Sequence, residues 1–211
     1  MQYMNLSMTT VNFYYSIGSR YSYLASSQIA ALEHDTGCRV VWHPLNSTTL
    51  IPRRGTNPFE GAPVSGQYEW SYREQDAKRW AALYRIPFVE PRDRVEFDSQ
   101  LLARAATAGK RLGRVVSYSH KLFAAMFVDP VTRIDAAECV RRAEACGMAP
   151  EQFRHELESV ETTQELEQVA EQACTLGVFG VPTFVVNAAL FWGNDRLVLV
   201  RHHLRSRLAA G

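Results

Sequence analysis

The spacing of apolar and polar positions divides the chain into strand-like ends and a helical middle. β-Branched and aromatic runs at 11–16, 39–43, 183–186 and 190–192 are typical of short strands. Between the first two runs, apolar positions from Tyr21 to Leu32 recur at helical spacing. This order predicts a strand–helix–strand unit, which is parallel and right-handed by default.

The segment from Gln67 to Leu176 shows helical periodicity almost throughout. Its apolar stripes predict helix faces buried in a core rather than cofactor sites. A capping-box pattern at Asp135–Glu138 and a first-turn proline at Pro150 indicate where two of these helices begin. Gly177 has the chemistry of the residue that ends the last of them.

The chain returns from helix to strand through the stretch Gly177–Val186. Pro182 stands directly before the strand, where it removes one hydrogen-bond donor and fixes φ. One interpretation is a trans proline that begins an edge strand. The other is a cis Val181–Pro182 bond, which would turn the Val181 amide and carbonyl toward an extended ligand.

Two further positions fall at predicted helix N-termini. Ser19 precedes the first helix, and Asn194 and Asp195 precede the last one, which is predicted from Leu197 to Leu208. Each side chain is explained by capping of first-turn amides. The alternatives are that Ser19 stabilises an anion or a thiolate, and that Asn194 or Asp195 binds an ammonium group.

Composition excludes several classes of function. Lys and Arg (23) balance Asp and Glu (22), which predicts neither a nucleic-acid nor an anionic-membrane partner. No apolar run approaches the roughly 20 residues of a membrane span, and the first ten residues lack the charge of a signal peptide. The four cysteines form no CxxC and no metal-ligand spacing, so we expect reduced thiols, no metal and a cytoplasmic protein. His43 is most simply a strand residue.

Three motifs resemble one enzyme family, the 2-hydroxychromene-2-carboxylate isomerases and kappa-class glutathione transferases. Residues 13–24 (FYYSIGSRYSYL) resemble its first motif, and residues 76–81 (DAKRWA) look like its mid-chain motif. Residues 177–184 (GVFGVPTF) and 191–197 (FWGNDRL) are similar to its C-terminal signature. The resemblance extends from about Val11 to the C-terminus.

The resemblance implies an α/β chain with a thioredoxin-like fold and a large all-helical insertion. Residues 11–45 and 163–211 would form the thioredoxin-like domain, and residues 46–162 the inserted domain. It also implies a homodimer with glutathione as cofactor. Ser19 would hold the glutathione thiol, Val181 before a cis Pro182 would pair with the cysteinyl unit, and Asn194 and Asp195 would bind the γ-glutamyl end. Asn57 corresponds to a further glutathione-binding asparagine.

The chain departs from the family pattern at four places. Ser16 stands where an aspartate is usual, and Arg20 where a proline is usual. Asn57 is displaced within its motif, and Glu69 replaces a lysine that often precedes the Arg-Trp pair. Because a glutamate cannot pair with a carboxylate, either this loop aligns differently or the substrate differs.

The resulting hypothesis is a glutathione-dependent isomerase acting on a small aromatic-derived substrate. A thiolate adds to an electrophilic carbon, the adduct rotates, and loss of the thiolate releases the isomer. The alternatives are a kappa-like transferase that conjugates glutathione to electrophiles, and a non-enzymatic thioredoxin-like binding module. Isomerase and transferase need the same thiolate site, so the sequence does not separate them.

Overall fold

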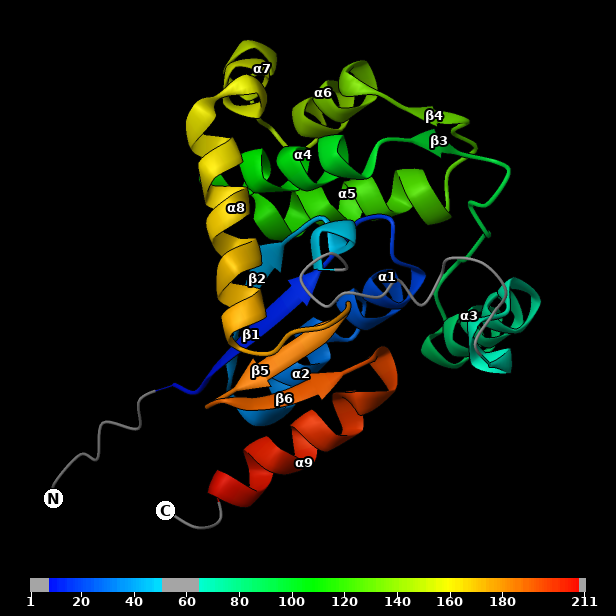
Figure 1. Cartoon of the computed structure of the whole chain (residues 1–211), viewed down its shortest axis with the longest axis vertical. Helices are drawn as coiled ribbons and strands as arrows, with labels where there is room; N and C mark the ends of the chain where they lie inside the picture. The colour runs from blue at the N-terminus through cyan, green and yellow to red at the C-terminus, as the bar shows by residue number, and fades with distance from the viewer. Residues whose placement is uncertain (1–7, 51–64, 209–211) are drawn as a thin grey trace, which may run out of the picture.

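A four-stranded mixed sheet forms the centre of the molecule (Figure 1). The computed structural model describes residues 8–50 and 65–208, so Asn57 lies outside the described residues. The strand order is β2-β1-β5-β6, with bounds Arg39–Pro44, Thr10–Tyr15, Thr183–Val186 and Ala189–Trp192. β1 is parallel to β2 and antiparallel to β5, which confirms the predicted parallel unit and the C-terminal hairpin.

The segment predicted as one helix after β1 is two helices, α1 (Arg20–Ser26) and α2 (Ile29–Thr36). Two serine hydroxyls at the break donate to backbone carbonyls one turn earlier. Ser26 Oγ lies 2.7 Å from the Tyr23 carbonyl oxygen, and Ser27 Oγ lies 2.7 Å from that of Leu24. Such bonds compete with the helical ladder, which explains the interruption that apolar spacing alone does not predict.

Helices dominate the described chain between β2 and β5. Their bounds are α3 Trp70–Tyr84, α4 Ser99–Arg111, α5 Val115–Phe127, α6 Ala136–Glu144, α7 Pro150–Glu158 and α8 Val160–Thr175. The sequence did not predict the two-residue strands β3 (Glu96–Phe97) and β4 (Arg133–Ile134). Short 3-10 helices are η1 Ser47–Leu50, η3 Gly66–Tyr68 and η4 Asn194–Arg196, and α9 (Leu197–Leu208) follows η4. A thioredoxin-like sheet with a helical insertion is therefore confirmed, while the exact domain boundaries stay a prediction.

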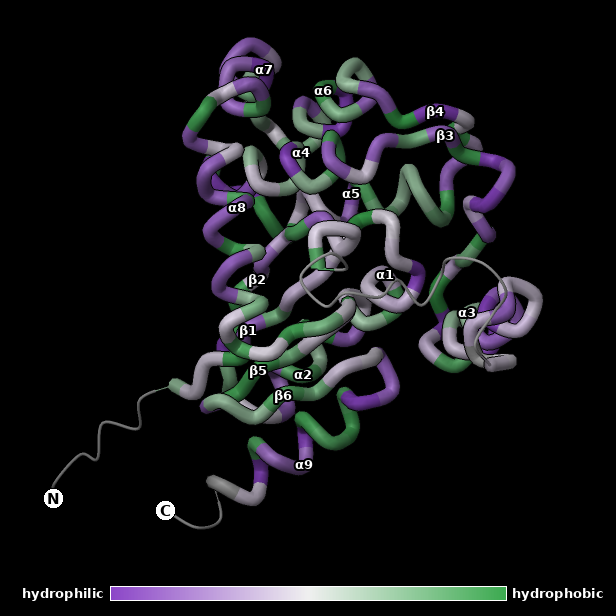
Figure 2. The backbone as a smooth tube through the Cα atoms, in the orientation of Figure 1, coloured by the Kyte–Doolittle hydropathy of each residue, from purple (hydrophilic) through white to green (hydrophobic). Residues whose placement is uncertain are grey.

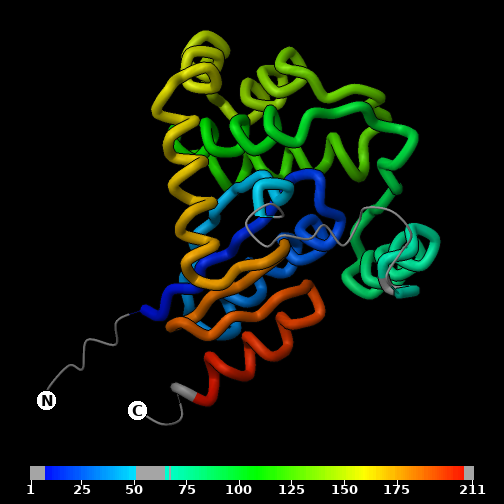
Figure 3. The backbone as a smooth tube through the Cα atoms, viewed as in Figure 1, coloured from blue at the N-terminus to red at the C-terminus, as the bar shows by residue number. Residues whose placement is uncertain are grey.

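The two faces of the sheet are covered by different helices (Figure 3). Phe13 and Phe184 pack in one cluster with residues of α1, α2 and α9, and this cluster continues into α4 and α5. On the opposite face, Tyr14 and Val185 pack against α8. The hydropathy colouring shows an apolar β5 at the centre and a largely hydrophilic α7 at the periphery (Figure 2).

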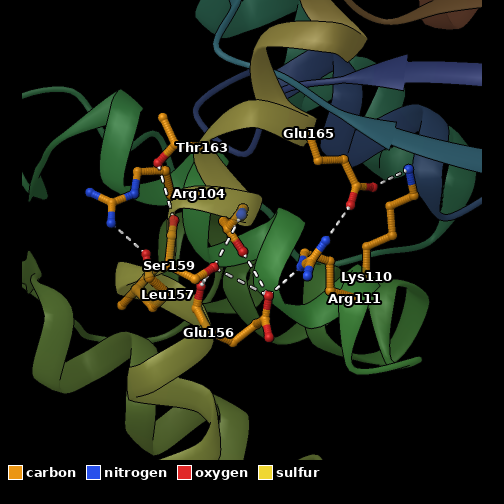
Figure 4. A network of polar contacts seen from close by, with 9 residues as sticks. Arg104, Lys110, Arg111, Glu156, Leu157, Ser159, Thr163 and Glu165 are labelled. Carbon is orange, nitrogen blue, oxygen red and sulfur yellow. Dashed lines mark hydrogen bonds and ion pairs between the residues drawn. The ribbon is translucent and has the colours of Figure 1, made fainter.

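Polar contacts fix the helical block to the rest of the chain. Tyr15 Oη on β1 lies 2.6 Å from Ser119 Oγ on α5. At the other end of the block, Lys110 Nζ on α4 lies 2.8 Å from Glu165 Oε1 on α8, and Arg111 contacts both Glu156 and Glu165 (Figure 4). These contacts hold α4 against α7 and α8.

Candidate functional site

The pairing of β1 with β5 brings two distant motifs to one end of the two central strands. Tyr14 is opposite Thr183 in this antiparallel pair. Val181 comes two residues before Thr183, and Ser19 comes five residues after Tyr14, so both follow from this one pair of strands. The Val181–Pro182 peptide bond is cis, as one of the two interpretations predicted.

Ser19 is the N-cap of α1, which confirms its capping role. Its Oγ accepts a hydrogen bond from the Ser22 amide at 3.2 Å, and the residue is half-buried. A hydroxyl also carries one donor hydrogen. Because Oγ accepts from the helix, that hydrogen remains able to point toward an anion at the mouth of the site.

Val181 presents backbone groups rather than its side chain. Its amide and carbonyl make no backbone hydrogen bond to the residues that the structure describes. The next turn is held in place, because the Gly193 amide donates to the Pro182 carbonyl at 2.9 Å. Val181 therefore offers one donor and one acceptor to an extended peptide-like ligand, in the manner of an added strand.

The aromatic rings of Phe179 and Trp192 pack together beside Gly180. Their centroids are 4.8 Å apart, and Trp192 is 44% exposed. A Cβ on Gly180 would lie 2.8 Å from the indole Nε1 of Trp192, so a larger residue at this position would displace the ring. Gly180 thus permits the indole to lie against the backbone one residue before Val181.

Asn194 and Asp195 begin the segment that leads into α9. Asn194 is 3% exposed, and its Nδ2 makes no hydrogen bond within residues 8–50 and 65–208. Asp195 is exposed and lies 3.5 Å from Arg196. Since η4 packs against α1, the structure brings Asn194 toward the helix that Ser19 caps. The Tyr84 hydroxyl lies close enough to interact with the Asn194 side chain, so Nδ2 has a polar neighbour in the described chain but no well-formed hydrogen bond.

Sequence reasoning singled out Arg20 but missed the residues around it. Arg20 is 7% exposed, and its Nη2 lies 3.0 Å from Glu90 Oε1. Burial lowers the pKa of Arg20, and the neighbouring Glu90 carboxylate opposes that shift. The guanidinium also lies 5.1 Å from the ring centroid of Trp70 on α3. Glu90 follows α3 in an irregular segment, so no periodic signal in the sequence identified it.

The family assignment rests on a match over nearly the whole chain. Residues 10–205 match the DsbA-like thioredoxin domain. The chain belongs to the DsbA-like thioredoxin domain family. This DsbA-like chain has no CxxC, and all four of its cysteines are free thiols.

Individual relatives carry names that are more specific than that of the family. A 2-hydroxychromene-2-carboxylate isomerase from Sphingobium xenophagum is 28% identical, with 92% of this chain and 97% of that protein covered. Human glutathione S-transferase kappa 1 is 24% identical, with 92% of this chain and 90% of that protein covered. A solved 2-hydroxychromene-2-carboxylate isomerase aligns with a TM-score of 0.78 at 25% identity, over 95% of this chain and 96% of that one. The family resemblance predicted from the motifs is thereby confirmed.

The described residues hold neither a membrane-spanning helix nor a cluster of metal ligands. None of the described helices has the length and apolarity to span a bilayer. In the described part of the chain, no group of three or more His, Cys, Asp or Glu side chains could hold a metal ion.

Proposed function

We propose that this protein is a glutathione-dependent isomerase of the 2-hydroxychromene-2-carboxylate isomerase type. The observation that carries the proposal is the antiparallel pairing of β1 with β5, because Ser19 follows the end of β1 and Val181, whose backbone makes no hydrogen bond to the described residues, directly precedes β5. The Ser19 hydroxyl would donate a hydrogen bond to a thiolate, and the Val181 backbone would pair with an extended peptide. The names of the isomerase and kappa transferase relatives support the same chemistry.

The residues around Val181 fit a γ-glutamyl peptide. Val181 would bind the cysteinyl unit through its amide and carbonyl, which places the thiol toward Ser19. Asn194 has a buried Nδ2 without a well-formed hydrogen bond, suited to a carboxylate, and the exposed Asp195 carboxylate is suited to an ammonium group. Asn57, outside the described residues, stays a predicted glutathione contact.

Ser19 acts on the protonation state of the thiol. A thiol with an ordinary pKa near 8.5 is mostly protonated at neutral pH. The hydroxyl hydrogen of Ser19 hydrogen-bonds to the charged form and lowers that pKa. When bound, glutathione supplies a nucleophilic sulfur that adds to the substrate and leaves again without net oxidation.

A kappa-like transferase is the second candidate, favoured by the two kappa transferases among the relatives. Calorimetry with glutathione tests the shared site. Turnover of 2-hydroxychromene-2-carboxylate, followed by NMR at limiting glutathione, separates the two activities. An isomerase converts many equivalents of substrate and leaves glutathione intact, whereas a transferase stops when glutathione is consumed. A non-enzymatic module gives no glutathione-dependent turnover, which would overturn the proposal.

Two broader expectations complete the proposal. We expect a homodimer and a cytoplasmic location, both of which rest on the family resemblance and on the reduced cysteines. Light scattering on the purified protein tests the first of these.

A further inference from the structure

A side-chain hydrogen bond closes the turn that carries Val181. Thr183, the first residue of β5, is fully buried, and its Oγ1 donates to the Gly180 carbonyl oxygen at 2.7 Å. This bond spans the two intervening residues and is separate from the backbone ladder of the sheet. Beside it, the Gly193 amide donates to the Pro182 carbonyl at 2.9 Å. The carbonyl before Val181 and the carbonyl after it therefore both have partners.

Thr183 is itself held by strands on both sides. In the antiparallel pairs of the sheet it lies opposite Tyr14 on β1 and opposite Trp192 on β6. β5 is an inner strand, with β1 and β6 as its neighbours (Figure 1). A threonine side chain is also stiff, because its branched Cβ restricts χ1. The Thr183 hydroxyl is therefore a well-fixed point from which to hold the turn.

The hydroxyl sets the direction of the Val181 amide. The Gly180–Val181 peptide bond is trans, so the Gly180 carbonyl and the Val181 N–H lie in one plane and point in opposite directions. Holding the carbonyl oxygen toward Thr183 therefore turns the N–H away from Thr183. Without this bond the peptide plane would have more freedom to rotate, because glycine has the widest choice of backbone torsions.

We propose that Thr183 is a positioning residue for glutathione, which acts by aiming the Val181 amide at the carbonyl of the cysteinyl unit. This inference rests on the proposed function, because it concerns the same docking backbone. The Val181 amide makes no backbone hydrogen bond to the residues that the structure describes, so it can donate to a ligand. A donor already held in its bound direction binds more tightly than a mobile one, because less conformational entropy is lost on binding.

Two substitutions at Thr183 separate the hydroxyl from the shape of the side chain. Thr183→Val keeps the branched shape and removes the donor, whereas Thr183→Ser keeps the donor. Calorimetry should show glutathione binding that is weaker by about three- to tenfold in Thr183→Val, the range of one net hydrogen bond, and within about twofold of wild type in Thr183→Ser. The same loss is expected for Thr183→Ala, which replaces Thr183→Val if the added methyl group prevents folding.

Steady-state kinetics with 2-hydroxychromene-2-carboxylate distinguish positioning from a general loss of structure. The docking backbone would hold glutathione equally in the ground state and in the transition state. The KM for glutathione should therefore rise in Thr183→Val, while kcat at saturating glutathione stays within about twofold of wild type. A fall in kcat with an unchanged KM would overturn the inference.

Thr107 on α4 provides a matched control. It is 1% exposed, and its Oγ1 donates to the Ala103 carbonyl at 2.9 Å, so Thr107→Val removes the same kind of buried bond. Glutathione affinity and KM should stay within about twofold of wild type in this variant. Equal losses of affinity in Thr107→Val and Thr183→Val would show a general effect on stability and overturn the inference. Urea unfolding of each variant checks that the fold is intact.

A measurement without ligand tests the amide itself. NMR relaxation should give the Val181 N–H an order parameter near the rigid value of about 0.85 in wild type and in Thr183→Ser. In Thr183→Val it should fall towards about 0.6, while the amides of Phe184 and Val185 within β5 keep their wild-type values. An unchanged order parameter at Val181 in Thr183→Val would overturn the inference, whatever the affinity for glutathione.

Glutathione calorimetry on the wild type separates this inference from the proposed function. If the wild type binds no glutathione, the proposed function is rejected, and with it a role for Thr183 in glutathione binding. If the wild type binds glutathione and Thr183→Val binds it equally well, only the role of Thr183 is rejected. Weaker binding in Thr183→Val, with wild-type binding in Thr183→Ser and Thr107→Val, is the result expected of a positioning residue.

Discussion

The Ser19 hydroxyl caps α1 and still has a hydrogen to donate, because Oγ accepts from the Ser22 amide. If the hydroxyl stabilises a bound thiolate, Ser19→Ala should raise the pKa of that thiol. One charge-assisted hydrogen bond is worth about 1.5–3 kcal/mol. This corresponds to roughly one to two pKa units, and to a loss of about tenfold to hundredfold in rate at neutral pH that shrinks as pH rises. Thiolate absorbance in the ultraviolet, titrated with glutathione bound, measures the shift.

Coincident titrations of wild type and Ser19→Ala would show that Ser19 acts only as the N-cap of α1. Loss of that cap costs about 1 kcal/mol of stability. Arg20 complicates this experiment because its charge is close. Replacing Arg20 alone would leave Glu90 buried without its partner. The suitable background is therefore the double variant Arg20→Gln, Glu90→Gln, in which both charges are removed together.

His43 makes stability depend on pH although it is not part of the proposed site. It is 9% exposed, stacks on Tyr14 and lies 2.9 Å from Asn12 Oδ1. Burial and then the charge of Lys110 lower its pKa from 6.5 to about 4, against an opposing effect of Glu165. In the unfolded chain His43 therefore binds a proton below about pH 6.5, whereas in the folded chain it binds one only below about pH 4.

The contribution of His43 to the free energy of unfolding should thus be constant above about pH 6.5. It should fall by about 2–3 kcal/mol as the pH drops to about 4. Urea unfolding from pH 7.5 to 4.5 should show a shallower decline for His43→Gln than for the wild type. His34→Gln, at a side chain that is 89% exposed, is the control and should follow the wild-type curve. Parallel curves for His43→Gln and wild type would contradict the assignment.

At the scale of elements, the contact between α4 and α5 depends on a glycine. A Cβ on Gly109 would lie 2.5 Å from Tyr118 Cδ1. Tyr118 is fully buried, and its hydroxyl donates to the Cys139 carbonyl at 2.9 Å, so the ring cannot easily move. Alanine gains about 1 kcal/mol in helix propensity, but overpacking costs about 1–3 kcal/mol.

We therefore expect Gly109→Ala to lower the free energy of unfolding by up to about 2 kcal/mol. Gly66→Ala meets no atom within 4 Å and should stay within about 0.5 kcal/mol of wild type. The midpoint of urea unfolding measures both. A higher midpoint for Gly109→Ala would show that helix propensity outweighs the clash.

Periodicity predicted most elements because each has an apolar face of regular spacing. It did not predict β3 and β4, whose two-residue strands are too short to show a period. It also did not predict the break between α1 and α2, which depends on serine hydroxyls rather than on hydrophobicity. Within the site, Ser19 and Pro182 were identified from local chemistry and motif. The Arg20–Glu90 ion pair was not, because its two residues are far apart in the chain and meet only through tertiary packing.

At the scale of the whole molecule, the sheet and the helical block share one core. Phe13 and Tyr15 belong to the same cluster as Tyr118 and Phe123, and Tyr15 bonds to Ser119. We expect one cooperative unfolding transition, with near- and far-ultraviolet circular dichroism coinciding. Tyr15→Phe leaves the buried Ser119 hydroxyl without its partner, and should destabilise the whole chain by about 1–3 kcal/mol. Two separate transitions, of which Tyr15→Phe moves only one, would show independently folding domains.

The position of the Trp192 indole beside Gly180 has an optical consequence. Trp192 is partly exposed and lies against Gly180, the residue before Val181, whereas Trp42 is buried at 4% exposure in the sheet core. A peptide that docks along Gly180 and Val181 would remove water from the Trp192 indole and change its fluorescence emission. The difference between the spectra of wild type and Trp192→Phe isolates this one fluorophore. If the proposed site is correct, the chain carries an intrinsic fluorescent reporter of its occupancy, one residue from the backbone expected to receive the ligand.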